Sequence, residues 1–511
     1  MRKRILHPFL FAAYPVLALL AYNIEEIKVQ DALRSLGISI LITWGIYWLL
    51  SKLLKNPSQA GLITTLGVSL FYSYGQIYHF VRPLTLLGIA PGRHRLLLPL
   101  WIGLFIVGIV IILRRKQQST SLTQLLNLTG IILVAFPVMQ IGLYSVRSLS
   151  SDSDRSSDPI AETGLSLPDR QATPDIYYII LDAYARDDTL HKEFGLNNEP
   201  FLQNLEKLGF YVARCSQSNY AQTRLSLSSS LNMNYLQELG ATFSPGNTSR
   251  IGITGLVRNS AVRQALEALG YTSIAFETGF KGTQWEDADI YLSPGGNGPN
   301  FNQFLGGLTS FEEMLLSTSV GAALIDSKLT APGNLQSRLN NPNHVHYDLI
   351  RFDLEELRGM PARPGPKLVF AHLVIPHPPY VFEADGQFVD YDKPDNPGYR
   401  DQVSFLNNAL IPILQQIITQ SATPPIIVVQ ADHGAILSPP GERMNILNAY
   451  YLPGVPNSAI AANISPVNTF RLIFNRYFSG SYALLENTAY FSVYNKPYEF
   501  RVIPNNRKAC P

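Results

Sequence analysis

Long apolar runs dominate the first 150 residues of the chain. Five of them cover about 5–24, 34–54, 59–80, 96–113 and 124–146. Each is long enough to cross roughly 30 Å of hydrocarbon as a helix. The first run is too long for the core of a signal peptide and no small-residue cleavage site stands out, so we read it as a retained helix. The pattern predicts an all-α membrane domain of five transmembrane helices over 1–148.

Basic residues indicate how this bundle is oriented. The opening MRKR, the pair Lys52 and Lys55, and the RRK at 114–116 all fall on one face of five alternating spans. By the positive-inside rule that face is cytoplasmic, although the 81–95 loop on the other side carries three arginines. Five spans that start inside end outside. We therefore predict a multi-pass protein of the plasma (inner) membrane, with its remaining chain extracytoplasmic.

The hydropathy pattern changes after the fifth run. Residues 149–173 are rich in Ser and Asp and predict a flexible linker. Beyond it, short apolar runs typical of buried strands lie at 176–180, 368–375 and 425–429, and helical patterns lie at 201–212, 261–270 and 347–359. Alternation of this kind predicts an α/β domain over 174–511 with a central, largely parallel sheet.

Composition agrees with a chain that is part membrane and part soluble. The 511 residues exceed one ordinary core, and only 15% of them are charged, against about 25% in soluble proteins. A net charge of +2 provides no basic field for nucleic acid. The two cysteines, Cys215 and Cys510, are too few for a thiolate zinc site. Outside the cytoplasm they could pair; one buried and one terminal thiol is the equal alternative.

Acidic and imidazole side chains follow three of the predicted strands. Asp182 comes after the first, His377 after the second, and Asp432 with His433 after the third. Ligands of parallel sheets bind outside the carboxyl ends of the strands. Singly, each residue has an ordinary reading as a turn former or helix cap. Together, carboxylates and imidazoles at one sheet edge predict a site for a divalent ion, Zn²⁺ or Mn²⁺.

A fourth segment, TRLSLSSSLN, begins a helical pattern with Thr223. A helix N-terminus favours an anion, and a hydroxyl bound there to a metal can become a nucleophile. A simple cap is the local alternative. Lys281 and Trp285, in the loop-like 276–294, and Arg443, ten residues beyond His433, are further candidates for substrate binding. An ordinary loop and an exposed structural arginine are their alternatives. Two more histidines, His344 and His346, we read as surface residues.

These motifs, in this order, resemble the alkaline phosphatase superfamily. The whole chain is similar in outline to its membrane-anchored, sulfatase-like branch, which includes lipoteichoic acid synthases and phosphoethanolamine transferases. The resemblance implies that Asp182, Thr223, Asp432 and His433 hold one metal ion. It also implies that Thr223 is the nucleophile and that His377 contacts the phosphate or sulfate of the substrate.

The chain departs from this pattern in three places. The Cys-x-Pro-Ser-Arg motif of formylglycine sulfatases is absent. Ala183 stands where sulfatases tend to carry a second acid, which indicates one metal rather than two. The segment after Gly434 does not match either transferase branch, so the substrate is left open.

The resemblance implies a metal-dependent transfer of a phospho-substituent from a lipid head group to an envelope glycan or lipid. The reaction would pass through a covalent phospho-threonine. One alternative is a phosphodiester, phosphate or sulfate ester hydrolase of the same fold, in which water is the acceptor. The other is a non-catalytic protein that binds the envelope. The four predicted metal ligands are all present, which favours an enzyme.

Overall fold

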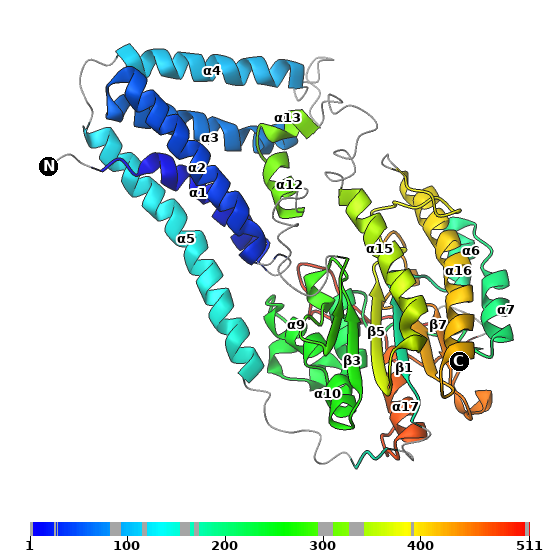
Figure 1. Ribbon diagram of the computed structural model, residues 1–511. Coiled ribbons are helices and arrows are strands. Elements are labelled where there is room, and N and C mark those ends of the chain that lie inside the picture. The colour runs from blue at the N-terminus through cyan, green and yellow to red at the C-terminus, as the bar shows by residue number, and fades with distance from the viewer. Residues whose placement is uncertain are drawn as a thin grey trace. The chain divides into compact units, whose positions relative to one another are not determined.

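The computed structural model describes residues 4–24, 27, 29–81, 94–114, 120–153, 164–167, 173–294, 310–325, 342–389, 393–505 and 510. By its internal contacts the chain divides into two compact units (Figure 1). One comprises Met1–Arg147 and Phe301–Pro342, and the other Ser148–Asn300 and Asn343–Pro511. The boundary near residue 148 lies where hydropathy changes. The apolar pattern did not predict that residues 301–342 return to the first unit.

The first unit contains the five expected N-terminal helices. They are α1 (His7–Tyr22), α2 (Val29–Leu54), α3 (Pro57–Val81), α4 (His94–Arg114) and α5 (Thr120–Ser153). Within α2, α4 and α5, three stretches are long and apolar enough to cross a membrane. Helix α1 has only 16 residues, and α3 carries polar side chains among its apolar ones. The number of crossings therefore stays a prediction. Helix α5 continues into the predicted linker, most of which lies outside the described residues.

Two short helices from the middle of the sequence pack against this bundle. They are α12 (Ser310–Ser317) and α13 (Gly321–Ile325). On α12, Phe311 and Leu315 join a buried apolar cluster with side chains of α1 and α2. Glu312 forms an ion pair with Arg34 of α2. The backbone N–H of Val320 donates to the carbonyl of Phe71 in α3 (2.9 Å). Residues far along the sequence thus cover the end of α1, the start of α2 and the end of α3.

The second unit is built on a seven-stranded sheet of order β2-β7-β6-β1-β5-β3-β4. Its strands are β1 (Ile176–Leu181), β2 (Tyr211–Val212), β3 (Thr272–Phe276), β4 (Ile290–Leu292), β5 (Lys367–Leu373), β6 (Ile426–Gln430) and β7 (Asn448–Tyr451). The pairs among β6, β1, β5, β3 and β4 are parallel, and those made by β7 are antiparallel. The expected largely parallel central sheet is confirmed.

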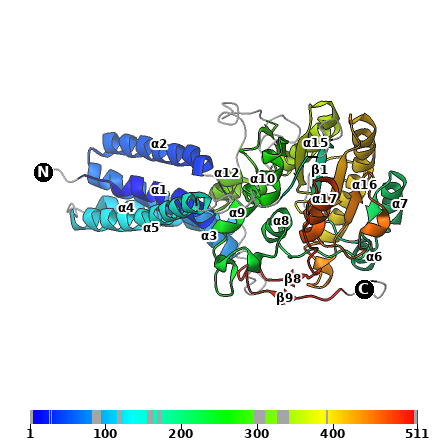
Figure 2. The same ribbon diagram turned by 90° about the horizontal axis from the view of Figure 1, so that it is seen from below.

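Helices cover both faces of this sheet (Figures 1 and 2). Odd positions of β1 pack with α6 (Asp187–Phe194), α7 (Glu199–Lys207), α15 (Pro342–Gly359) and α16 (Asp395–Gln420). Even positions pack with α8 (Thr223–Leu231), α9 (Ile251–Arg258), α10 (Ala261–Ala268) and α17 (Thr469–Tyr477). All six residues of β1 are buried. A strand buried on both faces explains why its sequence is apolar without alternation.

Three local expectations need correction. The helix predicted at 201–212 ends at Lys207, and its last residues form β2, because Gly209 with φ +95° turns the chain. The predicted loop at 276–294 contains the 3-10 turn η4 (Lys281–Thr283) and the edge strand β4. Strands β3 and β7 were not predicted. A small sheet of β8 (Tyr490–Phe491) and β9 (Arg501–Val502) forms near the C-terminus.

The two cysteines form a disulfide. Cys215 and Cys510 are 295 residues apart in sequence, with their Cα atoms 5.5 Å from each other. A crosslink that closes so long a loop restricts the unfolded chain strongly. We expect the double variant Cys215→Ser with Cys510→Ser to lose about 2–4 kcal/mol of unfolding free energy. Thermal unfolding of the full chain with and without dithiothreitol measures this. A reductant that lowers the melting temperature of wild type but not of the variant supports the bond; equal melting of all four samples contradicts it.

Candidate metal centre and active site

The strand register brings the two candidate acids side by side. Strand β1 pairs Ile180 with Gln430 of β6, so Asp182 and Asp432 occupy equivalent positions two residues beyond this pair. Both side chains are buried, with 3% and 1% of their residue surfaces exposed. His433 follows directly and is also buried. One ligand atom from each of these three residues lies within 4.8 Å of the others. The predicted cluster at the carboxyl edge of the sheet therefore forms.

Side chains along β1, β5 and β6 alternate between the two faces of the sheet. This alternation places the cluster on the face that helix α8 covers. Even-numbered residues of these strands pack on the face that α8 covers, and Tyr178 donates a hydrogen bond to Ser230 of that helix (3.1 Å). The even-numbered His372, within β5, follows the same alternation and is fully buried. Its Nε2 lies 3.4 Å from Asp182 Oδ2. A helix N-terminus thus lies on the face toward which the two acids project.

Two buried carboxylate oxygens in the cluster have no hydrogen-bond partner among the described residues. They are Oδ1 of Asp182 and Oδ2 of Asp432. The other oxygen of Asp432 accepts from the backbone N–H groups of Ala183 (3.1 Å) and His433 (2.8 Å). Ala183 adopts φ +66° to make this contact, a conformation that costs energy for a residue with a Cβ. Buried, unpaired carboxylate oxygens are unfavourable without a cation, so the residues fit a divalent ion.

His433 and Thr223 complete the predicted ligand set. The Nδ1–H of His433 donates to the carbonyl of Gly434 (2.8 Å), which leaves Nε2 as the nitrogen that could bind a metal ion when the ring is neutral. That Nε2 is 3.3 Å from Thr223 Oγ1, 3.7 Å from Asp182 and 3.6 Å from Asp432. Thr223 is the first residue of α8 and the only one of its nine residues that is not buried. Its hydroxyl therefore lies beside the cluster, on a residue that is partly exposed.

Glycine is required at position 434 by close packing. A Cβ there would lie 2.5 Å from the carbonyl oxygen of Asn445. The Gly434 N–H also donates to the carbonyl of Arg443 (2.8 Å). The chain after His433 therefore packs closely against residues 443–445. This packing places Arg443 near the site.

Imidazoles keep Asp182 ionised. Burial alone raises the pKa of this carboxyl, but His377, His372 and His433 outweigh burial and hold the pKa well below its ordinary value. Burial lowers the pKa of the Arg443 guanidinium, and Asp432 and Asp182 oppose that shift. The guanidinium is therefore within electrostatic reach of both acids. Its Nε donates to the carbonyl of Ala221, two residues before Thr223 (3.1 Å).

His377 lies where the sequence predicted, beside the acids. Its Nδ1–H donates to the carbonyl of Pro378 (2.6 Å), and the side chain is half-buried. Of the charged neighbours of Asp182, His377 has the largest effect on that carboxyl. The imidazole therefore lies close enough to Asp182 to affect that carboxyl electrostatically.

The reading of His346 as a surface residue is wrong. Its ring hydrogen-bonds to the backbone of Val374, and its buried Nε2 has no hydrogen-bond partner among the described residues. Burial and the neighbouring His377 lower the pKa of His346 to about 4, while the Val374 bond and Asp182 raise it. The residue is part of α15, which begins at Pro342 and so before the helical pattern predicted at 347–359. His344, on the same helix, is half-buried and bonds Asp348 (3.1 Å).

We expect His346 to make the fold sensitive to acid. The unfolded chain takes up a proton on this imidazole near pH 6.5 and the folded chain only near pH 4. The stability that neutral His346 contributes is therefore complete above pH 6.5 and is lost as pH falls toward 4, by up to about 3 kcal/mol. His346→Gln should flatten the fall in melting temperature over this window, measured in EDTA so that metal loss does not contribute. Exposed His191→Gln is the control. Equal slopes for both variants would contradict the assignment.

The structure treats the remaining substrate-binding candidates differently. Lys281 is the first residue of η4. The Thr283 hydroxyl, at the end of the same turn, lies 2.9 Å from Nδ1 of His372, so Lys281 lies near the edge of the site. Trp285 does not reach the site. It is fully buried, donates from Nε1 to the carbonyl of Val257 (2.9 Å) and stacks on Phe370 at 4.4 Å between centroids. Its ring is a core residue that no substrate can contact.

His372 is the residue of the site that sequence reasoning missed. The signal was present, since a histidine interrupts the apolar run LVFAHLVI. A buried strand accepts an imidazole only where its polar atoms have partners. Here Thr283 is the partner of Nδ1, whereas Nε2, 3.4 Å from Asp182 Oδ2, has no hydrogen-bond partner among the described residues.

No known family profile matches the sequence, and no curated protein is similar to it in sequence. Solved structures that it resembles include the zinc complex of the periplasmic domain of EcEptC from Escherichia coli. That match has 12% identity, a TM-score of 0.39, and coverage of 68% of this chain and 94% of that one. Another is the integral membrane lipooligosaccharide phosphoethanolamine transferase EptA from Neisseria meningitidis, at 10% identity, TM-score 0.40, and 93% and 95% coverage.

A third similar structure is a protein in the alkaline phosphatase superfamily from Vibrio parahaemolyticus. It shares 14% identity at a TM-score of 0.39, over 68% of this chain and 80% of that one. These proteins are of the classes whose motifs the sequence resembles.

Proposed function

We propose that this chain is a metal-dependent phosphotransferase that moves a phospho-substituent from a lipid head group to an envelope glycan or lipid. The observation that carries the proposal is the meeting of Asp182, Asp432 and His433 with the Thr223 hydroxyl at the start of a helix. Unpaired carboxylate oxygens favour a cation there, and the first N–H groups of α8 favour an anion. A phosphoryl group between them satisfies both.

Asp182, Asp432, His433 and Thr223 would hold one Zn²⁺ or Mn²⁺ ion. When bound, such an ion lowers the pKa of a coordinated hydroxyl and stabilises negative charge on phosphoryl oxygens. Thr223 Oγ1 would release its proton to solvent and attack phosphorus, and the bond from phosphorus to the lipid alcohol would break. His377 supplies the proton that the departing alcohol needs. The N–H groups at the start of α8 and the Arg443 guanidinium hold the non-bridging oxygens.

The second half of the reaction reverses these roles. His377, now neutral, takes the proton of the acceptor hydroxyl. The acceptor oxygen bonds to phosphorus as the bond to Thr223 breaks, and Thr223 Oγ1 takes a proton back from solvent, which regenerates the free hydroxyl. If water is the acceptor, the same residues perform hydrolysis. The first half-reaction is therefore common to the transferase and the hydrolase.

The proposal includes an inner-membrane location with the second unit outside the cytoplasm. The packing of α12 and α13 supports this orientation. These helices interrupt the proposed extracytoplasmic domain, and they contact the ends of α1, α2 and α3 that border the 23–33 and 81–95 loops. The positive-inside rule places the same loops outside. The disulfide supports it too, because disulfides persist in oxidising compartments.

A mass-spectrometric trapping experiment tests the function. The full chain, in detergent with Zn²⁺ or Mn²⁺, is mixed with phosphatidylethanolamine or phosphatidylglycerol, quenched in acid and digested. A phosphoethanolamine or phosphoglycerol adduct on Thr223, with diacylglycerol released, is the expected result. Fast release of the free head group without any glycan acceptor would favour the hydrolase. Absence of adduct and of release with either lipid, in protein shown to contain metal, would overturn the lipid-donor proposal.

A further inference from the structure

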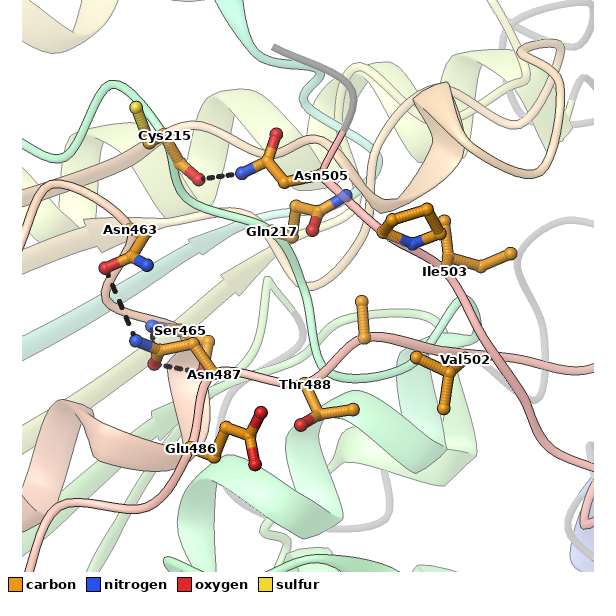
Figure 3. Close-up of a pocket in the computed structure, with 12 residues that line it drawn as sticks. Cys215, Gln217, Asn463, Ser465, Glu486, Asn487, Thr488, Val502, Ile503 and Asn505 are labelled. Atoms are coloured by element: carbon orange, nitrogen blue, oxygen red, sulfur yellow. Dashed lines mark hydrogen bonds between the residues drawn. The ribbon is translucent and has the colours of Figure 1, made fainter. Parts of the chain in front are cut away.

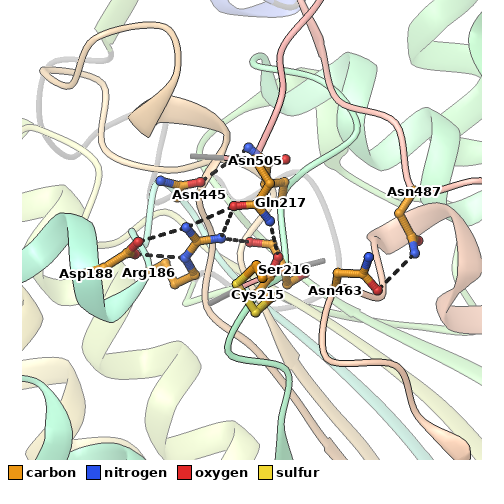
Figure 4. The surroundings of a disulfide bond; sticks show 10 residues. Arg186, Asp188, Cys215, Ser216, Gln217, Asn445, Asn463, Asn487 and Asn505 are labelled. Carbon is orange, nitrogen blue, oxygen red and sulfur yellow. Dashed lines mark hydrogen bonds and ion pairs between the residues drawn. A yellow bond between two sulfur atoms is a disulfide. The ribbon is translucent and has the colours of Figure 1, made fainter. Parts of the chain in front are cut away.

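The segment that leads into helix α8, residues 215–222, is bonded to distant parts of the chain. The carbonyl of Cys215 accepts a hydrogen bond from Asn505 Nδ2 (2.7 Å), as Figure 3 shows. The next carbonyl, that of Ser216, accepts from Arg186 Nη1 (3.0 Å; Figure 4). The segment is therefore fixed at its start, next to the disulfide.

The C-terminal part of the chain follows the same segment toward α8. The N–H of Tyr490 donates to the carbonyl of Asn219 (2.8 Å), and Tyr490 forms a β-bridge with Tyr220. Two residues further on, Gln222 Nε2 donates to the carbonyl (3.2 Å) and to the hydroxyl (3.1 Å) of Ser492. Two segments about 270 positions apart in sequence thus lie side by side up to the residue before the predicted nucleophile.

The side-chain amide of Gln222 has partners for both of its polar atoms. Its Nε2 bonds Ser492, and its Oε1 accepts from Arg250 Nη2 (3.0 Å). The same nitrogen of Arg250 donates to the carbonyl of Tyr494, and the guanidinium lies 3.9 Å from the centroid of the Tyr494 ring. Gln222 and Arg250 are both buried. A buried amide that is satisfied at both ends is held in one orientation.

Gln222 is also the N-cap of α8, a position that usually carries Ser, Thr, Asp or Asn. Its backbone is extended (φ −133°, ψ 135°), its carbonyl accepts from the N–H of Ser226 (2.9 Å), and its side chain makes no capping bond. A short polar side chain here would bond the first N–H groups of the helix and compete with a phosphoryl group for them. Gln222 instead bonds Arg250 and Ser492, so it fixes the start of the helix without capping it.

We propose that Gln222 is a positioning residue for Thr223, with Arg250 and Ser492 as its support. The inference rests on the proposed function, in which Thr223 Oγ1 must reach both the ion and phosphorus. Gln222 touches neither of them and acts through the backbone of the residue that follows it. A displacement of the hydroxyl by about 1 Å is enough to slow such a reaction by about 100-fold.

Gln222→Met tests this, because it keeps the length of the side chain and removes its three hydrogen bonds. With the full chain in detergent, Zn²⁺ and bis(p-nitrophenyl) phosphate, kcat should fall by about 10- to 100-fold while KM changes by less than about twofold. Gln217→Met is the matched control. Gln217 is a buried glutamine of the same segment, and among the described residues its side chain bonds only Asn445, at 3.4 Å. This variant should keep the kcat of wild type.

Arg250→Met provides a second variant in case Gln222→Met folds poorly. It should show the same fall in kcat at constant KM. The double variant should lose little more than the worse single variant, because both changes act through one amide. Hydrogen exchange measured by mass spectrometry should be faster over 219–226 in both single variants, with the rest of the second unit unchanged. This second measurement does not depend on turnover.

Three outcomes would overturn the positioning role. They are an unchanged kcat in Gln222→Met, an equal loss in Gln217→Met, and losses that multiply in the double variant. Absence of turnover in metal-loaded wild type would instead overturn the proposed function. In that case hydrogen exchange decides whether Gln222 anchors Thr223: faster exchange in Gln222→Met supports the anchoring, and unchanged exchange contradicts it.

Discussion

Replacing Thr223 by alanine should reduce turnover by a factor on the order of 10⁴ or more, because it removes the nucleophile and leaves only binding and electrostatic stabilisation. Bis(p-nitrophenyl) phosphate provides a chromogenic phosphodiester for the measurement, and the lipid adduct on residue 223 should disappear with it. Thr223→Ser, which keeps the hydroxyl, should retain measurable turnover and become labelled at the same position.

Ser226→Ala is the matched control for this experiment. Ser226 is on the same helix, three residues further on, is buried, and has no hydrogen-bond partner for its hydroxyl among the described residues. Loss of that hydroxyl should change turnover little. Equal turnover in Thr223→Ala and wild type would show that another group attacks phosphorus. A loss shared with Ser226→Ala would indicate damage to the helix rather than loss of a nucleophile.

The isosteric variant Asp432→Asn should lose bound metal and, with it, the stabilisation that the metal gives to wild type. Without metal, the wild-type chain holds the buried carboxylates of Asp182 and Asp432 close together with unpaired oxygens. Removing one charge relieves that repulsion, so the EDTA-treated variant should melt above EDTA-treated wild type. With Zn²⁺ at about 1,000 times its dissociation constant, wild type should gain about 4 kcal/mol, and the variant should gain almost nothing.

Elemental mass spectrometry and melting curves with and without Zn²⁺ measure both effects. About one metal ion per wild-type chain and little in the variant is the expected result. Asp395→Asn, an exposed acid at the start of α16, should behave as wild type. A variant that still binds the ion and is stabilised by it would remove Asp432 from the ligand set. If wild type neither binds Zn²⁺ or Mn²⁺ nor gains stability from them, the result would favour the non-catalytic alternative, a protein that binds the envelope.

The apolar pattern determined the broad organisation of this protein. Five long runs became five helices, and the short runs at 176–180, 368–375 and 425–429 became three adjacent central strands. These signals are readable because each depends on local length and composition. The placement of Asp182, Asp432, His433 and His377 at one edge followed as well, because parallel strands share the edge where their carboxyl ends lie.

Edge strands and antiparallel strands were harder to predict from the sequence. Strand β2 has two residues and β4 three, too few for a periodicity to appear. The sequence did not decide whether the disulfide forms, since no local feature places residues 215 and 510 within bridging distance. The sequence also did not predict the packing of α12 and α13 on the N-terminal helices, because this packing depends on contacts across more than 200 positions of the chain.

The tertiary structure also decided which polar residues belong to the site. His372 and His346 are near Asp182, while Trp285 is in the core; all three depend on which face of a strand or helix meets which neighbour. A sequence shows that a residue follows a strand, and with a parallel sheet that is enough to place its backbone. Whether a side chain then points at a metal, a substrate or a packed interior is set by long-range packing, which local patterns do not encode.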